Sequence, residues 1–150
     1  MIELYQQALK EHNNNPVGLA KSIQATHTAE GYNASCGDEI TFQLKISQNN
    51  QQIIDISFDC DCCAICKASA SALCVVCHGR DIRYLEQQTN LLGQLLSHTT
   101  QDENTTLKLA SQLGFLIPIR KHISRHNCAL LPWQTALNAC AHPVVLARIN

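Results

Sequence analysis

The sequence predicts an α+β fold, a small three-stranded antiparallel sheet with helices packed on one face. Three segments in which apolar and polar residues alternate come early in the chain, and segments with helical periodicity fill most of the later part. The 150 residues are the length of one ordinary domain, with no internal repeat, linker or low-complexity tail. We therefore expect a single domain over residues 1–150.

The first part of the chain is expected to hold one helix and the whole sheet. Apolar residues recur at helical spacing over 2–12, and Asn13-Asn14-Asn15-Pro16 then ends the helix. Strands are expected over 22–33, 38–47 and 51–60, where the alternation is typical of half-buried strands. Because the connections GYNASCG and QNNQQ are short and rich in turn residues, the strands should form an antiparallel meander.

The second part of the chain is expected to be helical. After Cys63 the residues are apolar nearly all round a helical projection, which predicts a buried helix that ends near Gly79. Two further helices are expected over 81–97 and 104–113, and a last helix over 127–141.

The charge pattern and the hydropathy exclude two classes of partner. The formal net charge is -1 and the eleven Lys and Arg residues are scattered, so we expect no binding to nucleic acid. The N-terminal segment carries charges and no uninterrupted apolar run, which argues against a signal peptide, and no segment is long and apolar enough to span a bilayer. We expect a soluble, cytoplasmic protein without a membrane partner.

Nine cysteines are the most unusual feature of the sequence, and six of them lie in DCDCCAICKASASALCVVCHGR at 59–80. In a reducing cytosol such a chain binds metal or handles sulfur more often than it forms disulfides. Cys60, Cys62 and Cys63 also stand too close in sequence to pair readily with one another. We interpret Cys74 and Cys77, on the predicted buried helix, as small hydrophobic core residues.

Three separate segments offer ligands for a metal. In CGD at 36–38, Cys36 and Asp38 stand two apart where a turn enters a strand, so both can point at one ion, although an ordinary turn has the same composition. Cys63 precedes the buried helix and Cys128 opens the last one, and the free N–H groups of a helix start favour a thiolate. Three thiolates and one carboxylate suit zinc or one edge of an iron–sulfur cluster. Spacing alone does not select these four residues over Cys60 or Cys62.

Four ordered blocks of the sequence carry a resemblance to a known family. They are EHNNNP, GYNASCGDEI, FDCDCCAICKASAS and IRKHISRHNCALLPW, and the resemblance that they carry extends over nearly the whole chain. The chain resembles the U-type iron–sulfur cluster assembly proteins, a family that includes IscU, the N-terminal domain of NifU, and SufU. The resemblance implies the SufE/NifU-like fold and places Cys36, Asp38, Cys63 and Cys128 at the positions of the family's metal or cluster ligands.

Within that family the sequence looks closest to the SufU-like branch. IscU-type members carry a His immediately before the last cysteine and a Pro-Pro chaperone-docking motif upstream, whereas this chain has Asn127 and no such motif. Extra helical sequence before Cys128, and Arg125 three residues ahead of it, look like SufU. The chain also departs from the family, since Cys60 and Cys62 stand where glycines are usual and Cys66 where a Ser is usual.

The resemblance implies a function in iron–sulfur cluster assembly. A SufU-like protein binds zinc and accepts sulfur from a cysteine desulfurase. In such a protein Cys128 or Cys63 would take up the sulfur, and Arg125 would steady an anionic thiolate or persulfide. The alternative within the family is an IscU-like scaffold, which assembles a [2Fe-2S] cluster and passes it to a downstream cluster carrier or apo-protein. We expect a scaffold or a sulfur acceptor rather than an enzyme. If the protein is an enzyme, it is expected to be a sulfurtransferase.

Three interpretations from other classes stay open. A structural zinc site would use the same four ligands, although an all-cysteine set suits such a site better than one that contains Asp38. Cys63 and Cys66 form a CxxC motif at a helix start, as in thiol oxidoreductases, although the motif follows a meander rather than a βαβ unit. A cysteine hydrolase would need a histidine base, and no spacing selects one among the histidines.

Overall fold

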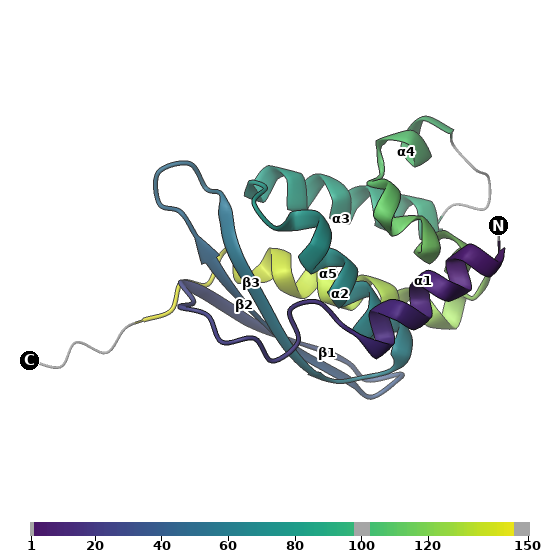
Figure 1. The fold of residues 1–150 in the computed structure, drawn as a ribbon, viewed down its shortest axis with the longest axis horizontal. Coiled ribbons are helices and arrows are strands. Elements are labelled where there is room, and N and C mark those ends of the chain that lie inside the picture. The colour runs from purple at the N-terminus through teal and green to yellow at the C-terminus, as the bar shows by residue number, and fades with distance from the viewer. Residues whose placement is uncertain (1, 98–102, 146–150) are drawn as a thin grey trace, which may run out of the picture.

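Three strands form one antiparallel sheet in the computed structural model, which describes residues 2–97 and 103–145. The strands β1 (His27–Asn33), β2 (Asp38–Ile46) and β3 (Ile53–Asp61) pair in chain order as a meander, and the helices cover one face of the sheet (Figure 1). The predicted α+β class and the antiparallel three-stranded sheet are therefore confirmed.

Helices make up most of the described chain outside the sheet. Their bounds are α1 (Ile2–Asn14), α2 (Ala64–Cys77), α3 (Ile82–Ser97), α4 (Glu103–Lys108) and α5 (His126–Ala139), with the 3-10 helices η1 (Ser111–Lys121) and η2 (Ile123–Arg125) before α5. Helix α5 packs on β1 and β2, and α2 contacts both α1 and α5. Within the described residues no helix is both long and apolar enough to cross a membrane.

The first strand is shorter than predicted, because β1 begins at His27 and the expected strand over 22–33 is wrong at its start. The preceding residues form a loop along the free edge of β3. There the Ala20 N–H donates to the Phe58 carbonyl over 2.7 Å, and the Ser57 hydroxyl donates to the Lys21 carbonyl. Residues 22–26 then connect this edge to the start of β1, and Thr26 donates its N–H to the Leu44 carbonyl over 2.8 Å, so the alternating pattern of this segment belongs to a connection rather than to a strand.

The predicted helix over 104–113 is wrong in its second half, since α4 ends at Lys108. Gln88 of α3 explains the break. Its Nε2 donates to the Lys108 carbonyl over 3.2 Å, and its Oε1 accepts from the Ala110 N–H over 2.8 Å. These bonds take backbone groups that a longer helix would use for itself. The chain continues as η1, an unpredicted 3-10 helix with Pro118 in its interior.

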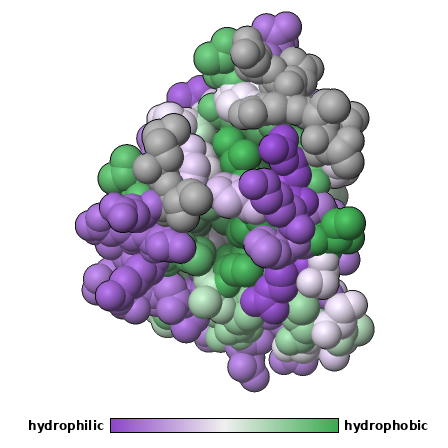
Figure 2. Space-filling model, turned by 90° about the vertical axis from the view of Figure 1, so that its right-hand side faces the viewer, coloured by the Kyte–Doolittle hydropathy of each residue, from purple (hydrophilic) through white to green (hydrophobic). Residues whose placement is uncertain are grey.

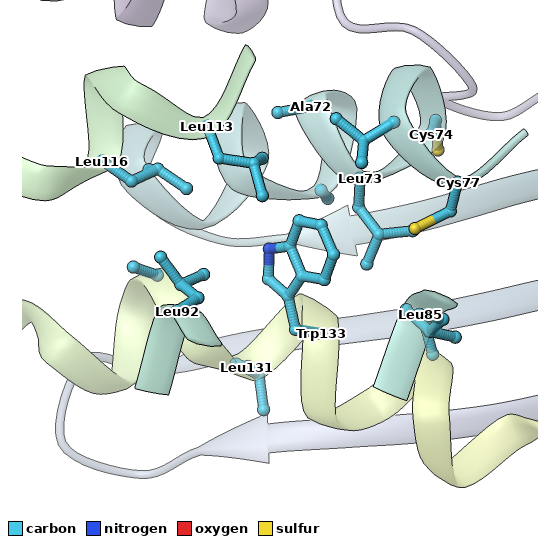
Figure 3. Packing of buried hydrophobic residues seen from close by; sticks show 14 of the residues in the cluster. Ala72, Leu73, Cys74, Cys77, Leu85, Leu92, Leu113, Leu116, Leu131 and Trp133 are labelled. Atoms are coloured by element: carbon cyan, nitrogen blue, oxygen red, sulfur yellow. The ribbon is translucent and has the colours of Figure 1, made fainter. Parts of the chain in front are cut away.

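Trp133 of α5 lies at the centre of the core and is fully buried. Figure 3 shows its ring among apolar side chains, including Leu73 of α2 and Leu92 of α3. Its Nε1 donates to the Ser69 hydroxyl over 3.0 Å, and this hydroxyl donates to the Ala129 carbonyl over 2.6 Å. The buried polar atoms are thus paired, and the ring fixes α2 against α5.

Close packing also fixes α5 on the sheet. A side chain at Gly31 of β1 would collide with the Thr135 side chain of α5, so the helix can approach the strand only because this residue is a glycine. As a result the starts of α2 and α5 meet the turn between β1 and β2 at one end of the molecule, on the right in Figure 1. Figure 2 shows that side, where hydrophobic surface appears in patches between hydrophilic side chains.

Candidate metal centre

The turn between β1 and β2 presents Cys36 and Asp38. Gly37 has φ +68°, a left-handed conformation that glycine adopts without strain, and it lets the chain turn between the two residues. Asp38 begins β2 opposite Asn33, the last residue of β1. The Asp38 side chain is fully buried, whereas Cys36 is half-exposed.

Two hydrogen bonds hold the buried Asp38 carboxylate. Its Oδ1 accepts from the backbone N–H of Cys63 over 2.8 Å, and its Oδ2 accepts from Asn33 Nδ2 over 3.3 Å. A buried carboxylate is costly unless it is paired in this way. Asp38 therefore ties the β1–β2 turn to the start of α2.

Cys63 is the N-cap residue of α2. It has extended backbone, and its Sγ accepts from the Cys66 N–H over 3.5 Å. A side chain that accepts from the N3 N–H satisfies one of the free donors at a helix start. The Cys63 thiol also lies 3.9 Å from Asp38 Oδ2, so this sulfur is directed toward the carboxylate.

Cys128 lies in the first turn of α5 and is fully buried. Its Sγ is 3.2 Å from Cys36 Sγ and 3.8 Å from Asn33 Nδ2. Burial, followed by the hydrogen bond with Cys36 and the neighbouring Cys63 and Asp38, raises the pKa of the Cys128 thiol well above its ordinary value. The protein on its own thus favours a neutral Cys128, and a nearby cation would reverse this preference.

The structure brings the predicted ligands together. Ligand atoms of Cys36, Asp38 and Cys128 all lie within 4.8 Å of one another, and Cys63 adjoins this group through Asp38 and Cys128. The site offers three soft sulfurs and one carboxylate. Because they are crowded together, negative charge on one sulfur disfavours negative charge on the next. Such a donor set suits a divalent cation or a cluster of iron. The donor set therefore fits zinc or iron.

Cys60 and Cys62, the sequence's other candidates for this site, belong to a different group of thiols. Each is half-buried, and they hydrogen-bond with each other. This bond and burial raise the pKa of Cys60. For Cys62 the bond with Cys60 lowers the pKa, but a hydrogen bond with Cys66 and burial outweigh this effect and raise the pKa to about 12. Among the described residues, the group with ligand atoms within 4.8 Å of one another consists of Cys36, Asp38 and Cys128, and it contains neither Cys60 nor Cys62.

The remaining predictions for individual residues concern Arg125 and the core cysteines. Arg125 is the N-cap residue of α5, is half-buried, and stands three residues before Cys128. Cys74 and Cys77 are buried in the core, as predicted, and burial raises the pKa of Cys77 to about 12. Asn33, whose amide reaches both Asp38 and Cys128, was not among the residues predicted from the sequence. Its place opposite Asp38, at the end of a predicted strand, was the available signal.

The fold and the grouped side chains define a small α+β domain with a cluster of thiols and one carboxylate suited to a soft metal. The chain belongs to the family of the NifU-like N terminal domain, whose model matches residues 4–111. IscU and SufU are among its relatives, so the chain is a member of an iron–sulfur cluster assembly family.

Two relatives align over most of the chain. The iron–sulfur cluster assembly scaffold protein IscU of Thermotoga maritima is 28% identical over 136 residues, which are 91% of this chain and 92% of that protein. The zinc-dependent sulfurtransferase SufU of Bacillus subtilis is 24% identical over 131 residues, which are 87% of this chain and 85% of that protein. The similarity to a scaffold and to a sulfurtransferase leaves two roles to compare.

Solved structures support the fold. A NifU-like protein (N-terminal) from Brucella abortus superposes with a TM-score of 0.77 at 17% identity, covering 93% of each chain. The SufU of Fervidobacterium islandicum superposes with a TM-score of 0.75 at 24% identity, covering 92% of this chain and 97% of that one.

Proposed function

We propose that this protein accepts sulfur from a cysteine desulfurase and holds zinc through Cys36, Asp38, Cys63 and Cys128, as a SufU-like sulfur acceptor. The observation that carries the proposal is the grouping of three ligand atoms within 4.8 Å, with Cys63 joined to it through Asp38. Membership of the assembly family and similarity to a zinc-dependent sulfurtransferase support the same role.

The four side chains have different parts in this proposal. Zinc, when bound, keeps thiols deprotonated and orders the loops that carry them. Asp38 supplies a harder oxygen among soft sulfurs and is the ligand that exchanges most readily. Its hydrogen bonds with the Cys63 N–H and Asn33 keep the carboxylate in position when it is not a ligand. Asp38 thus frees one ligand position without loss of local structure.

Sulfur uptake is a transfer between thiols. The thiolate of Cys63 or Cys128 attacks the outer sulfur of the desulfurase persulfide, and the desulfurase cysteine leaves as a thiolate. Cys63 is half-buried and Cys128 is fully buried, so Cys63 is the more accessible acceptor in the described conformation. The role assigned to Arg125, which stands three residues before Cys128 at the start of α5, is to supply positive charge to the thiolate or persulfide anion on the acceptor cysteine.

The second candidate role is an IscU-like scaffold that assembles a [2Fe-2S] cluster on the same four residues. The observation in its favour is the 28% identity with a protein named as a scaffold, against 24% with the sulfurtransferase. In that role iron and sulfide are the material being assembled, and a downstream cluster carrier or apo-protein receives the product.

Metal and acid-labile sulfide content of the protein purified without air distinguishes the two roles. A sulfur acceptor should contain about one zinc per chain and no sulfide. Cys36→Ser, Asp38→Ala, Cys63→Ser and Cys128→Ser should lose the metal, while Cys77→Ser, a matched change in the core, should retain it. Iron and sulfide in equal amounts, held more firmly in Asp38→Ala, would establish the scaffold instead. A protein that takes up no metal would overturn both roles.

A desulfurase assay tests the transfer itself. Added protein should raise the rate at which a cysteine desulfurase turns over cysteine. Arg125→Ala should lower this stimulation about tenfold while zinc content stays unchanged, since Arg125 is not a ligand in the proposal. Arg83→Ala, on the exposed side of α3, serves as the control for loss of a positive charge. Equal stimulation by both variants would remove Arg125 from the mechanism.

A further inference from the structure

The helices leave one face of the sheet open, and the end of this face nearest the metal centre is acidic (Figure 1). Four exposed carboxylates lie there, in the last two cross-strand rows of the open face before the β1–β2 turn. We name this group the acidic face, and its members are Glu30, Glu39, Asp59 and Asp61. Glu39 stands directly opposite Asp61, and two like charges in such a pair destabilise a sheet. The stability of the isolated chain therefore does not explain the acidic face.

No basic side chain lies within ion-pair distance of the acidic face in residues 2–97 and 103–145. The ion pair that these residues contain joins Lys21 to Asp55, further along β3. Asp59 accepts a hydrogen bond from the neighbouring Cys60 N–H over 2.9 Å, which leaves its negative charge in place. The surface is thus complementary to a partner with positive charge.

A hollow of about 660 Å³ lies among these carboxylates. The Tyr32 side chain, which is 62% exposed, lines the hollow together with Ile40 and Cys60. The hollow thus combines apolar groups with a charged rim, as the contact surfaces of many proteins do. The occupant that fits it best is an apolar side chain between positive charges.

A segment of this same chain has those properties. Residues 120–126 read RKHISRH and carry positive charge on Arg120, Lys121 and Arg125. Ile123, in the middle of these charges, is 82% exposed. We name residues 120–126 the basic segment. It offers an apolar side chain between positive charges, which is what the hollow and its rim require.

The two surfaces are not paired within one copy, since the basic segment also makes no ion pair in the described part of the chain. Both lie at the end of the molecule that carries the metal centre, because the acidic face borders the β1–β2 turn and the basic segment leads into α5. Figure 2 looks onto this end, where hydrophobic surface appears between hydrophilic side chains. Surfaces of opposite charge at the same end allow two copies to meet there.

We propose that two copies of this chain associate as a two-fold pair, with the basic segment of each copy on the acidic face of the other and Ile123 in the hollow beside Tyr32. In a two-fold pair the same contact is made twice, so the attraction between the charges and the apolar contact both count twice. The formal net charge of -1 adds little overall repulsion between the copies. The inference goes beyond the proposed function and depends on neither zinc nor sulfur transfer.

Sedimentation of the full chain as purified, under reducing conditions that exclude a disulfide between copies, tests the association. We expect an equilibrium between monomer and dimer at low salt. The dimer should dissociate in about 1 M salt, because salt screens the charges that hold the copies together. A protein that stays monomeric at about 1 mM in low salt would overturn the proposal.

Charge-reversed variants show which surfaces meet. The face variant carries Glu30→Lys, Glu39→Lys, Asp59→Lys and Asp61→Lys. The segment variant carries Lys121→Glu, His122→Glu and Arg125→Glu. Each variant alone should lose at least about tenfold in association constant, since like charges then oppose one another in both contacts. An equal mixture of the two variants should dimerise again, because each contact then joins opposite charges. Failure of the mixture to recover, or unchanged association of the segment variant alone, would overturn the proposal.

Controls separate the proposed contact from general effects of charge. Arg83→Glu and Glu86→Lys, on the exposed side of α3, should leave association unchanged. Ile123→Ser keeps every charge and should weaken association several-fold, because it removes the side chain that enters the hollow. Where circular dichroism shows that the face variant does not fold, Glu30→Gln with Asp59→Asn takes its place and should also weaken association. Oligomers that keep growing with concentration would show an open arrangement and overturn the two-fold pair.

Discussion

The two ends of α2 place cysteines in opposite environments. At the N-terminal end, Cys63 is half-buried, accepts a backbone hydrogen bond and faces the Asp38 carboxylate. At the C-terminal end, Cys77 is fully buried in the core, where Figure 3 shows it close to Leu73. Burial raises the pKa of Cys77 to about 12, so this thiol stays protonated and acts as a small hydrophobic side chain.

The difference shows that the position of a cysteine on a helix decides its chemistry. The first turn of a helix has free N–H groups that stabilise negative charge on sulfur, whereas the last turn offers none. The start of α2 also meets the turn that carries Cys36 and Asp38. Changes at the C-terminal end should therefore affect stability, and changes at the N-terminal end should affect metal binding.

The largest expected effect on stability is that of Leu73→Ala in the core half of α2. Leu73 is fully buried, and removing its side chain leaves a cavity beside Trp133. The free energy of unfolding should fall by about 2–5 kcal/mol, with zinc content per folded chain unchanged. Urea unfolding measures the loss. Val75→Ala, two residues away on the exposed side of α2, should cost less than about 1 kcal/mol. Equal losses would show that the two faces of α2 do not differ.

A pair of Cys→Ser variants sharpens the comparison between the two ends. Cys77→Ser puts a hydroxyl among apolar side chains and should lower the free energy of unfolding by about 1–3 kcal/mol. Cys63→Ser should leave the stability of the metal-free protein within about 1 kcal/mol, because Ser is a good N-cap residue. Metal analysis should give the reverse order, with zinc lost only in Cys63→Ser. Loss of zinc in the folded Cys77→Ser variant would contradict the division of roles.

The sequence predicted the parts of the fold whose signal is local. The alternation in β2 follows from a sheet with one buried face, and the all-round apolar pattern of α2 follows from its place between α1 and α5. The end of α4 was not predictable in this way, since it depends on the side chain of Gln88 from another helix. Such a contact between distant segments leaves no periodic signal.

For the candidate site, the sequence predicted the residues but not how they group in space. Helix starts and a glycine turn drew attention to Cys36, Asp38, Cys63 and Cys128, and the resemblance to a family separated them from Cys60 and Cys62. Their grouping depends on contacts between segments as far apart as Asn33 and Cys128. Sequence periodicity contains no information about which segments meet, so the roles of these residues remain proposals to be tested by metal analysis.

Asn33→Ala tests how far the metal-binding end of α2 depends on its neighbours. The Asn33 amide donates to Asp38 Oδ2 over 3.3 Å and reaches Cys128 Sγ at 3.8 Å, so it orients two proposed ligands. Zinc affinity, measured by competition with a chelator, should fall about tenfold in the variant. Gln43→Ala, on the exposed face of β2, should leave affinity unchanged. An unchanged affinity in Asn33→Ala would mean that the ligands hold their positions without this amide.

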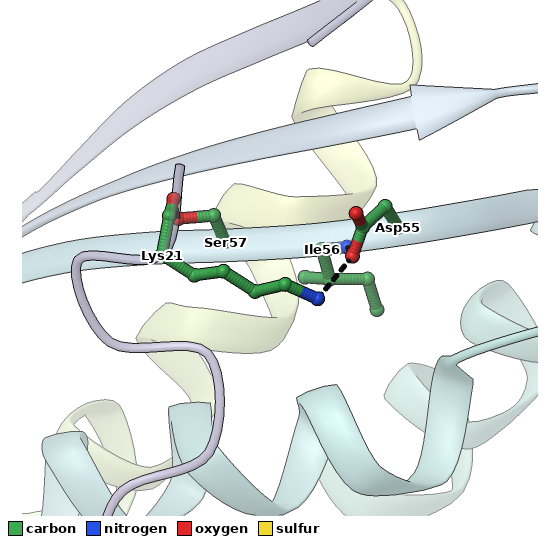
Figure 4. A network of polar contacts seen from close by, with 4 residues as sticks. All are labelled: Lys21, Asp55, Ile56 and Ser57. Atoms are coloured by element: carbon green, nitrogen blue, oxygen red, sulfur yellow. Dashed lines mark hydrogen bonds and ion pairs between the residues drawn. The ribbon is translucent and has the colours of Figure 1, made fainter. Parts of the chain in front are cut away.

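The smallest expected effect is that of the ion pair beside the core end of α2. Lys21 Nζ lies 2.7 Å from Asp55 Oδ1 (Figure 4), and both charges act electrostatically on Cys74. The hydrogen bond with Lys21 is the main cause that holds the pKa of Asp55 below its usual value. The folded protein therefore favours the ionised form. The resulting stabilisation is present above the unfolded pKa of about 3.8 and is lost as pH falls through the lower folded value.

Since Lys21 is 50% exposed and Asp55 28% exposed, solvent screens the pair, and Lys21→Met should lower the free energy of unfolding by about 0.2–1 kcal/mol at pH 7. The difference between the variant and the unchanged protein should shrink below pH 3.8 and at high salt, which urea unfolding at several pH values and salt concentrations measures. A difference that persists in 1 M salt would show that the aliphatic part of Lys21 contributes by packing rather than by charge. Zinc content should not change, because the pair lies at the end of α2 that takes no part in the proposed site.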